Sequence, residues 1–512
     1  MDTNAQAAES VNTAGERELK LNIVFGMGYQ ILTIVINYLT KQALKRTLGT
    51  GYLGMQTVFA NFSDVLMFAF MGIGIAMLFR LYKPFADGDR KMLNGVFHYF
   101  NRVFRGFSIA VAVIGAAVSG LVVMTINADI EARKIVVCYL LYLFAVVIHN
   151  RVQVCFYYMM ADQKRYMACI ITAVFEAAAM FFQLAALYML GSYTLFLIAI
   201  LVKDVVTAIG FIVYMWRNYP YLLTEKVVLQ EEEKKGALGN VGDMIITRVG
   251  NTLLNCTDSI ITSSVVSTVM AGVYSNYYFI MTGITNLVVT FYDSVMAKLG
   301  VKLAADPEGD HFADYREMLA VNLLFAAAAT SGFYNLSRDF ITLWMGDDVI
   351  LEGMVVVILT FNLHMSVMRN SAATYRQAAG LFSKISYLIL FRGVFNIILS
   401  VILGLRMGLT GVILATTISD ITTVYWYEPM MVYRHQRKKM FIELAYQFVG
   451  AILSLSSIYL SGLAVRQIHV STWIGFLEET AVVAGICVLW GGFWITLPKI
   501  MRKLFRKKEV LR

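Results

Sequence analysis

The chain has 512 residues, of which 58% are hydrophobic and 15% are charged. Soluble domains carry about 25% charged residues, so this composition excludes an ordinary water-soluble protein and predicts an all-α, polytopic membrane protein. The net charge of +9 does not indicate nucleic-acid binding, because the basic residues are spread over many short connections.

Hydropathy predicts about 14 transmembrane helices, given that one span needs about 20 apolar residues. They lie at 20–41, 53–79, 104–126, 135–160, 168–190, 193–216, 240–263, 271–297, 318–336, 352–378, 383–404, 409–432, 443–464 and 473–497. The polar segment before the first helix, 1–19, is predicted to be a cytoplasmic tail that is disordered over 1–16.

The basic residues indicate the orientation of these helices. Most of the 43 Lys and Arg residues fall in alternate connections and in the C-terminal tail, 499–512. By the positive-inside rule both termini are predicted to be cytoplasmic. The connections on the other side are short, which disfavours a membrane sugar polymerase or another enzyme with a large extracellular loop.

The sequence predicts neither a cofactor nor a metal site. The 5 cysteines and 6 histidines lack CxxC, HExxH and nucleophile-elbow spacing, so neither a zinc site nor a catalytic site is indicated. The chain is therefore predicted not to be an enzyme and to need no cofactor.

The predicted helix 240–263 is the least suited to lipid. One face of it carries polar residues at helical spacing, and Arg248 lies beside them. The stripe consists of Asp243, Thr247, Asn251, Asn255, Asp258 and Thr262. A charge at membrane depth costs about 2.5 to 3.5 kcal/mol, so this face is expected to line an aqueous cavity. A packed polar seam between helices is the alternative.

Two offsets align the halves of the chain. A shift of 218 residues matches Asn22 with Asn240, Gly54 with Gly272 and Arg151 with Arg369, and a shift of 216 matches later positions such as Asp204 with Asp420. Because six helices per copy is an even number, the two lobes are predicted to be parallel repeats related by a pseudo-two-fold axis. The predicted parts are an N-lobe at 20–217, a cytoplasmic linker at 218–237, a C-lobe at 238–435 and two further helices at 436–498.

Four arginines are predicted to lie at one depth, about 15 Å from the cytoplasmic helix ends. They are Arg151, Arg248, Arg369 and Arg392, with the acidic Glu176, Asp204 and Asp420 and the basic Lys203 near that level. Two interpretations stay open. In the first, Glu176 pairs with one arginine and Asp204 pairs with Lys203 or another basic residue, which locks helices together. In the second, the arginines bind a diphosphate bidentately.

Several carboxylates are candidates for ion coupling. Asp64 lies mid-helix among Phe59, Phe62 and Phe68, where a carboxyl group is desolvated. Asp243, Asp258 and Glu176 are the other candidates. An interhelical hydrogen bond or interfacial solvation are the alternatives for these side chains.

Three stretches resemble Wzx-type polysaccharide flippases of the multidrug, oligosaccharidyl-lipid and polysaccharide exporter superfamily. They are 48–89, beginning LGTGYLGMQTVFANFSDVL, 257–280, beginning TDSIITSSVVSTVMAGVYSN, and 375–435, beginning YRQAAGLFSKISYLILFRGVFN. The sequence departs from relatives at Phe70, where an acidic residue is common before the LGIG-like segment MGIG.

The resemblance implies two six-helix lobes around a lumen and a cargo of undecaprenyl-diphosphate-linked oligosaccharide, moved across the bacterial cytoplasmic membrane for capsule or another surface polysaccharide. Arg248, with Arg151, Arg369 or Arg392, is expected to hold the diphosphate, and Asn251, Asn255 and Gln153 to contact sugars. Polysaccharide polymerase and other assembly proteins are possible partners. A peptidoglycan lipid II flippase and a cation-coupled multidrug exporter of the same superfamily are the alternatives.

Overall fold

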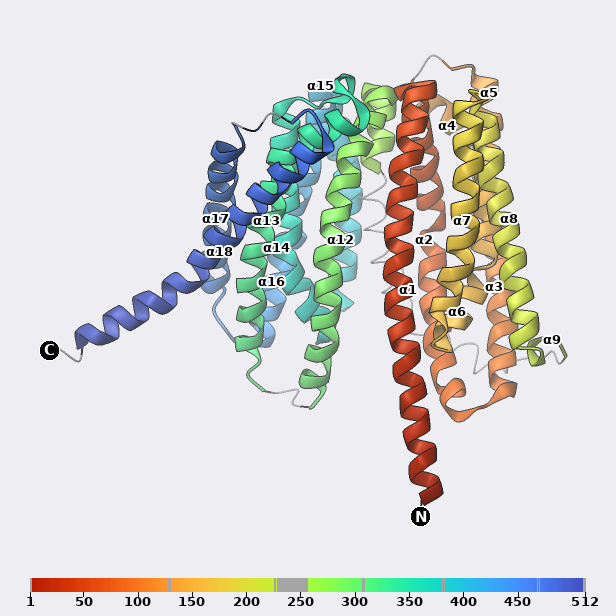
Figure 1. Ribbon diagram of the computed structural model, residues 1–512, viewed down its shortest axis with the longest axis horizontal. Coiled ribbons are helices and arrows are strands. Elements are labelled where there is room, and N and C mark those ends of the chain that lie inside the picture. The colour runs from red at the N-terminus through yellow and green to blue at the C-terminus, as the bar shows by residue number, and fades with distance from the viewer. Residues whose placement is uncertain are drawn as a thin grey trace. The chain divides into compact units, whose positions relative to one another are not determined.

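A computed structural model describes residues 2–127, 130–224, 227, 257–305, 309–379, 381, 383–466, 468 and 470–509. Every regular element within these residues is helical. The chain divides into two compact units, Met1–Thr252 with Ser267–Gly272, and Leu253–Val266 with Val273–Arg512. Each unit is a bundle of long helices joined by short connections (Figure 1).

Long helices connected by tight turns build the first unit. They are α1 (Asp2–Leu48), α2 (Thr50–Asp87), α3 (Arg90–Ala117), α4 (Ser119–Thr125), α5 (Ala132–Arg151), α6 (Gln153–Ala161), α7 (Arg165–Tyr188), α8 (Tyr193–Asn218) and the short α9 (Tyr221–Thr224). Asn22 fixes α1 to the α6–α7 turn, because its side chain donates to the Gln163 carbonyl (2.6 Å) and accepts from the Tyr166 amide (2.7 Å).

The second unit holds the remaining helices. They are η1 (Thr262–Val266), most of α12 (Thr268–Ala305), α13 (Phe312–Met345), η2 (Asp347–Val349), α14 (Gly353–Ala378), α15 (Ser383–Thr422), α16 (Val424–His435), α17 (Phe441–Val465) and α18 (Trp473–Glu509). Lys438 joins two connections of this unit by donating to Asp310 (2.6 Å), and this hydrogen bond lowers the pKa of the Asp310 carboxyl.

Within the described residues the predicted helices agree with the observed ones in place, with differences at their ends, and most of the predicted helix 240–263 lies outside those residues. The predicted span 104–126 is broken at Val118 into α3 and α4, and the span 135–160 is broken at Val152 into α5 and α6. α15 contains the predicted span 383–404 and the first part of the predicted span 409–432, as far as Thr422. Gly408, whose φ is 61°, separates these two spans. The predicted disordered tail is wrong for the described residues, because α1 begins at Asp2.

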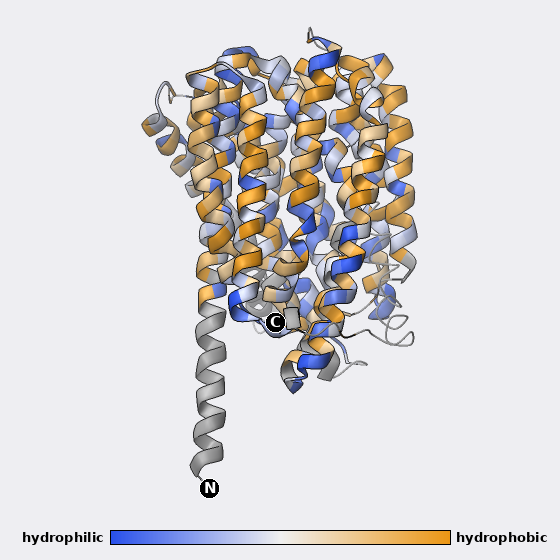
Figure 2. Ribbon diagram, turned by 90° about the vertical axis from the view of Figure 1, so that its right-hand side faces the viewer, coloured by the Kyte–Doolittle hydropathy of each residue, from blue (hydrophilic) through white to orange (hydrophobic). Residues whose placement is uncertain are grey.

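Eight stretches of the described residues are long and apolar enough to cross a membrane. One of them, Ile385–His435, includes the turn at Gly408 and so contains more than one span. Figure 2 shows hydrophobic residues along most of the length of the helices. The protein is therefore an all-α, multi-pass membrane protein.

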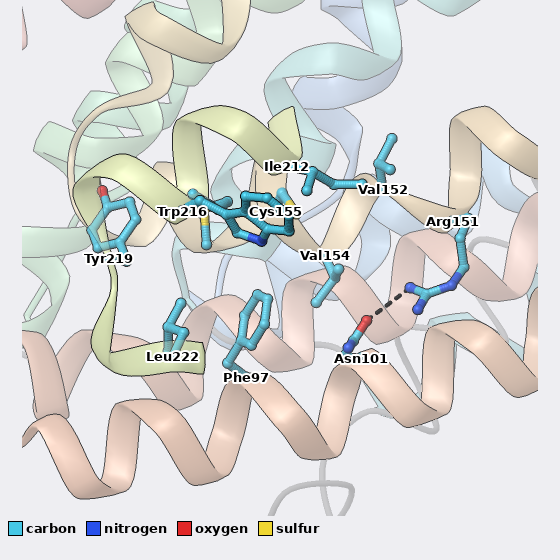
Figure 3. A pocket seen from close by; sticks show the side chains of 11 residues that line it. Phe97, Asn101, Arg151, Val152, Val154, Cys155, Ile212, Trp216, Tyr219 and Leu222 are labelled. Carbon is cyan, nitrogen blue, oxygen red and sulfur yellow. Dashed lines mark hydrogen bonds between the residues drawn. The ribbon is translucent and has the colours of Figure 1, made fainter. Parts of the chain in front are cut away.

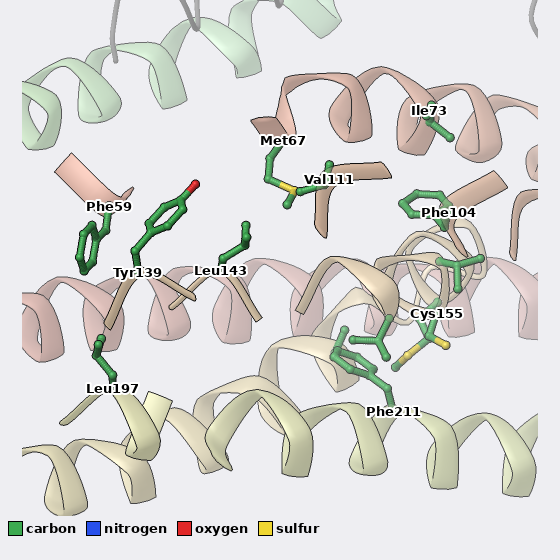
Figure 4. Close-up of a cluster of buried hydrophobic side chains, with 14 of the residues drawn as sticks. Phe59, Met67, Ile73, Phe104, Val111, Tyr139, Leu143, Cys155, Leu197 and Phe211 are labelled. Carbon is green, nitrogen blue, oxygen red and sulfur yellow. The ribbon is translucent and has the colours of Figure 1, made fainter. Parts of the chain in front are cut away.

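The core of the first unit is a continuous cluster of apolar side chains. Phe59, Phe104, Tyr139 and Leu197 belong to it and are at most 1% exposed (Figure 4). Where helices approach most closely, glycine is required. A Cβ atom on Gly74 would overlap the Tyr157 ring, so the aromatic side chain occupies the space that the glycine leaves.

The element boundaries support the internal repeat. α2 and α12 are both 38 residues long, and both their first and last residues differ by the predicted shift of 218. Gly191, which precedes α8, has a positive φ. A shift of about 216 residues relates it to Gly408, which also has a positive φ. A glycine with positive φ therefore occurs at similar places in the two halves.

Candidate functional site

The polar stripe of the predicted helix 240–263 is described only at its C-terminal end. Arg248, Asp243, Asn251 and Asn255 lie outside the described residues, and their proposed contacts with substrate stay predictions. Asp258 and Thr262 are described, and both are buried.

Arg151 ends α5 in the first unit, and its Nη1 donates to the side-chain oxygen of Asn101 on α3 (2.8 Å). The two residues lie at one end of a cavity of about 330 Å³ between α3, α6 and α8 (Figure 3). Among the described residues no carboxylate pairs with Arg151. Its charge is therefore bonded to a neutral amide and is not neutralised there.

Arg369, the repeat partner of Arg151, belongs to a three-membered cluster in the second unit. Its Nε lies 3.3 Å from Glu428, and Nη2 of Arg376 lies 3.3 Å from the other oxygen of the same carboxylate. Arg369 and Arg376 are seven residues apart on α14, which places them on one helix face. One carboxylate thus serves two guanidiniums, and the cluster keeps one positive charge.

Arg392 is neutralised by Asp420 (2.9 Å), and its side chain is only 2% exposed. The turn at Gly408 makes this pair possible, because it folds the two halves of α15 back on each other. A Cβ atom on Gly411 would overlap the Leu403 carbonyl, so glycine is required for this reversal. The interpretation of Arg392 and Asp420 as a structural ion pair therefore has direct support.

Asp258 lies against the same folded pair of helix segments. Its Oδ2 accepts a hydrogen bond from Thr416 (3.0 Å), whose hydroxyl is also bonded by the side-chain amide of Asn396 (3.0 Å). The second oxygen, Oδ1, is buried with no hydrogen-bond partner among the described residues. A buried carboxylate with one oxygen unused can take up a proton or contact a cation.

The repeat partner of Asp420 in the first unit, Asp204, is held by basic groups. Lys203 lies 3.0 Å from it and His149 lies 3.3 Å from it. Gln153 bonds the His149 ring (2.9 Å), and its predicted contact with sugars stays a prediction. The pairing of Asp204 with Lys203 that the sequence suggests is present.

Two other predicted coupling groups lie on α2 and α7. Asp64 is on an exposed face of α2, whereas Phe59 is buried in the core, so these two side chains point to different surroundings. Glu176 lies on α7 beside the hydroxyl of Tyr29 on α1, and within the described residues it has no arginine partner. A coupling role for either carboxylate stays a prediction.

The sequence prediction overlooked Glu428, Arg376 and Asn101. Glu428 is only 3% exposed, yet it lies next to Pro429 in a segment that hydropathy places at a helix end. The spacing of Arg369 and Arg376 was the available signal, since two arginines on one face of an apolar helix need an acid nearby. Asn101 gave no signal, because a single asparagine is common at interhelical contacts.

Comparison of the sequence with protein-family profiles finds no match, and no curated protein matches it. Solved structures do resemble the fold. The lipid II flippase MurJ in an inward closed conformation has a TM-score of 0.67 and 14% identity, covering 93% of this chain and 100% of its own. An inward-facing multidrug resistance MATE transporter of the MOP superfamily has a TM-score of 0.60 and 13% identity, covering 79% of this chain and 96% of its own.

A third structure, a mutant of the Vibrio cholerae MATE transporter VcmN, gives a TM-score of 0.58 and 13% identity, covering 83% of this chain and 98% of its own. These similar proteins are transporters and a flippase rather than enzymes. At such low identity the similarity establishes the architecture alone. The chain therefore shares its fold with MurJ and the MATE transporters.

Proposed function

We propose that the protein is a flippase that moves undecaprenyl-diphosphate-linked oligosaccharide units across the bacterial cytoplasmic membrane for surface-polysaccharide synthesis, by alternating access. The proposal rests on one observation, that the charges of two repeat-related arginines are not fully balanced by carboxylates among the described residues. Arg151 has an amide partner and no carboxylate among the described residues, and Arg369 shares one carboxylate with Arg376. Each lobe thus offers positive charge to an anionic headgroup.

The chemistry of the headgroup explains why arginine suits this task. A diphosphate presents several oxygens, and guanidinium groups bind such oxygens in pairs. The Arg369 side chain is 26% exposed, whereas the Arg392 side chain is 2% exposed and forms an ion pair with Asp420. We therefore assign the headgroup to Arg151, Arg369 and Arg248, and we assign Arg392 a structural role.

Transport needs no bond chemistry, because two conformations that differ by a few kcal/mol and a polar path are sufficient. No nucleotide-binding motif occurs in the sequence, so an ion gradient or consumption of the product must supply direction. Asp258 is the candidate coupling group, because it is buried and keeps one oxygen without a partner among the described residues.

Deleting the gene tests the proposal. We expect an undecaprenyl-linked glycan to accumulate on the cytoplasmic side, and the wild-type gene to clear it. The double variant Arg151→Gln with Arg369→Gln should insert normally and fail to restore export. Arg102→Gln removes a charge next to Asn101 on α3 and is the matched control, which should export normally.

Two results would refute the proposal. One is normal surface polysaccharide and no accumulated lipid-linked glycan in the deletion strain. The other is full export by the double arginine variant, which would mean that transport does not need phosphate contacts from these two arginines. In the same assay Asp258→Asn should abolish dependence on the membrane gradient, and unchanged dependence would exclude it as the coupling group.

A peptidoglycan lipid II flippase is the second candidate function. The similarity to MurJ, with the higher TM-score of 0.67, favours it over a multidrug exporter. The two flippase functions differ in their consequence for the cell. If the gene is essential and lipid II accumulates on its depletion, the cargo is the peptidoglycan precursor, and if growth continues without the gene, the cargo is a dispensable glycan.

A further inference from the structure

The repeat-related aspartates Asp204 and Asp420 have different cationic partners. Asp420 is paired with Arg392 (2.9 Å), and a guanidinium is always charged. The shift of 216 residues places Glu176 at the position of Arg392 in the first unit, so a carboxylate stands there instead of an arginine. Asp204 has the Nδ1 atom of His149 at 3.3 Å. The first unit therefore has a titratable partner where the second unit has a permanent charge.

Lys203 already balances the charge of Asp204. Its Nζ atom lies 3.0 Å from Oδ1 of Asp204, and the two side chains are 16% and 4% exposed. A buried carboxylate that has one ammonium partner needs no second cation. His149 can therefore be neutral or charged without leaving Asp204 unpaired.

Both ring nitrogens of His149 have partners. Nδ1 faces the carboxylate of Asp204, which accepts hydrogen bonds, so the ring proton belongs on Nδ1. Nε2 lies 2.9 Å from the side-chain nitrogen of Gln153, which donates to it. This arrangement suits a neutral imidazole. A second proton would bind at Nε2, and the Gln153 amide would then rotate so that its oxygen accepts from the new N–H group.

The His149 ring is exposed on a face of α5 that differs from the exposed apolar face. Its side chain is 41% exposed. The apolar row of α5 consists of Val137, Leu140 and Phe144, which are 48%, 39% and 55% exposed. His149 follows Phe144 by five residues, which places it about 140° away around the helix. The ring therefore does not lie in the row that meets hydrocarbon, and protons can reach it.

The helices that pack against α5 bring few other charges toward this ring. Tyr142 lies on the same face of α5, and Asp64 of α2 is close enough for its charge to act on the Tyr142 hydroxyl. Arg151 is bonded to a side-chain amide of α3, and Arg105 of α3 acts on Arg151. α4 and α6 carry no charged residue. The charges in direct contact with the His149 ring therefore come from α8.

We propose that His149 is a proton-binding group of the first unit, whose second proton is held at Nε2 and reverses the side-chain amide of Gln153, while Asp204 accepts from Nδ1. A hydronium ion gives up the proton and becomes water, an Nε2–H bond forms, and the imidazole becomes an imidazolium. The site is separate from Asp258, which belongs to the second unit. One consequence rests on the proposed function, because a reversed Gln153 would present its nitrogen instead of its oxygen to a sugar.

Nitrogen NMR of the purified full-length protein tests the site. The histidine rings are labelled with a heavy nitrogen isotope, and the signal of His149 is the one that His149→Gln removes. At about pH 8 this signal should show a proton on Nδ1 and none on Nε2, and at about pH 5 it should show both. Asp204→Asn should lower the ratio of charged to neutral ring about tenfold at intermediate pH, since it removes a charge-assisted hydrogen bond.

Asp162→Asn is the matched control. Asp162 is paired with Lys164 (2.6 Å) at another place in the first unit, so this variant should keep the wild-type ratio. If Asp204→Asn does not fold, Lys203→Gln tests the same contact with the opposite sign, because the carboxylate then serves His149 alone and the ratio should rise. The proposal is overturned if the ring stays neutral over this pH range, if its single proton is on Nε2, or if the ratio is unchanged in the folded variant.

The NMR experiment and the glycan assay can fail separately, because the spectra are recorded without cargo. A titrating His149 ring, together with normal surface polysaccharide in the deletion strain, supports the proton site and refutes the flippase. A ring that stays neutral, together with accumulated lipid-linked glycan in the deletion strain, has the opposite meaning. In that second case His149 only links α5 to α8.

Discussion

Glu428 is the side chain on which two guanidiniums depend, that of the buried Arg376 and that of the half-buried Arg369. Both of its oxygens are used, one by Arg369 and one by Arg376, at 3.3 Å each, and its side chain is 4% exposed. Removing one partner of a buried ion pair leaves an uncompensated charge, and this is more costly than the pair itself is stabilising. The charge balance of the second unit is therefore sensitive to this single residue.

Glu428→Gln is expected to destabilise the protein by about 3 to 5 kcal/mol, because Arg369 and Arg376 lose their shared carboxylate. A lower midpoint of thermal unfolding, followed by size-exclusion chromatography in detergent, would show this. Glu317→Gln on α13 is the matched control, since this glutamate is exposed, and its midpoint should not change. Equal midpoints for the two variants would mean that the ion pairs contribute nothing to stability.

At the scale of elements, the approach of α2 to the first turn of α12 requires glycine. Within the first unit, a Cβ atom on Gly54 would overlap the Thr268 carbonyl oxygen, and one on Gly272 would lie 2.8 Å from the Gly54 nitrogen. The two glycines are partners in the 218-residue repeat. Two repeat-related positions therefore touch each other, backbone against backbone, where no side chain fits.

Gly54→Ala should force these two segments apart and destabilise the protein by about 1 to 3 kcal/mol, the usual effect of overpacking. Gly106→Ala on α3 is the control, because nothing lies within 4 Å of the Cβ position there. This second variant should be neutral or stabilising by up to about 1 kcal/mol, since alanine favours helix over glycine. Comparing the unfolding midpoints of both variants checks the prediction, and equal midpoints would contradict it.

For the whole molecule, the distribution of basic residues predicts the orientation in the membrane. Lysines and arginines concentrate in the connections assigned to the cytoplasm and in the tail 499–512. The segment after α13, Gly346 to Leu351, carries Asp347 and Asp348 instead. It is therefore predicted to face the opposite side.

Reporter fusions test this orientation. Green fluorescent protein fused after Arg512 should fluoresce, because it folds in the cytoplasm, whereas alkaline phosphatase inserted at Asp348 should be active, because it needs the oxidising side of the membrane. Phosphatase fused after Arg512 is the reciprocal control and should be inactive. Activity of that control fusion would reverse the predicted topology.

The sequence by itself determined the membrane class and the positions of most of the described helices, and it predicted the repeat, because hydropathy, glycine positions and charge distribution are properties of short segments. It also identified Arg369, Arg392 and Asp420 as residues of interest. Only the tertiary structure decided which charges are neutralised. Asp420 reaches Arg392 because the chain reverses at Gly408, and Glu428 reaches two arginines because α16 lies beside α14. Partners of a buried charge are set by packing between distant segments, which no local pattern encodes.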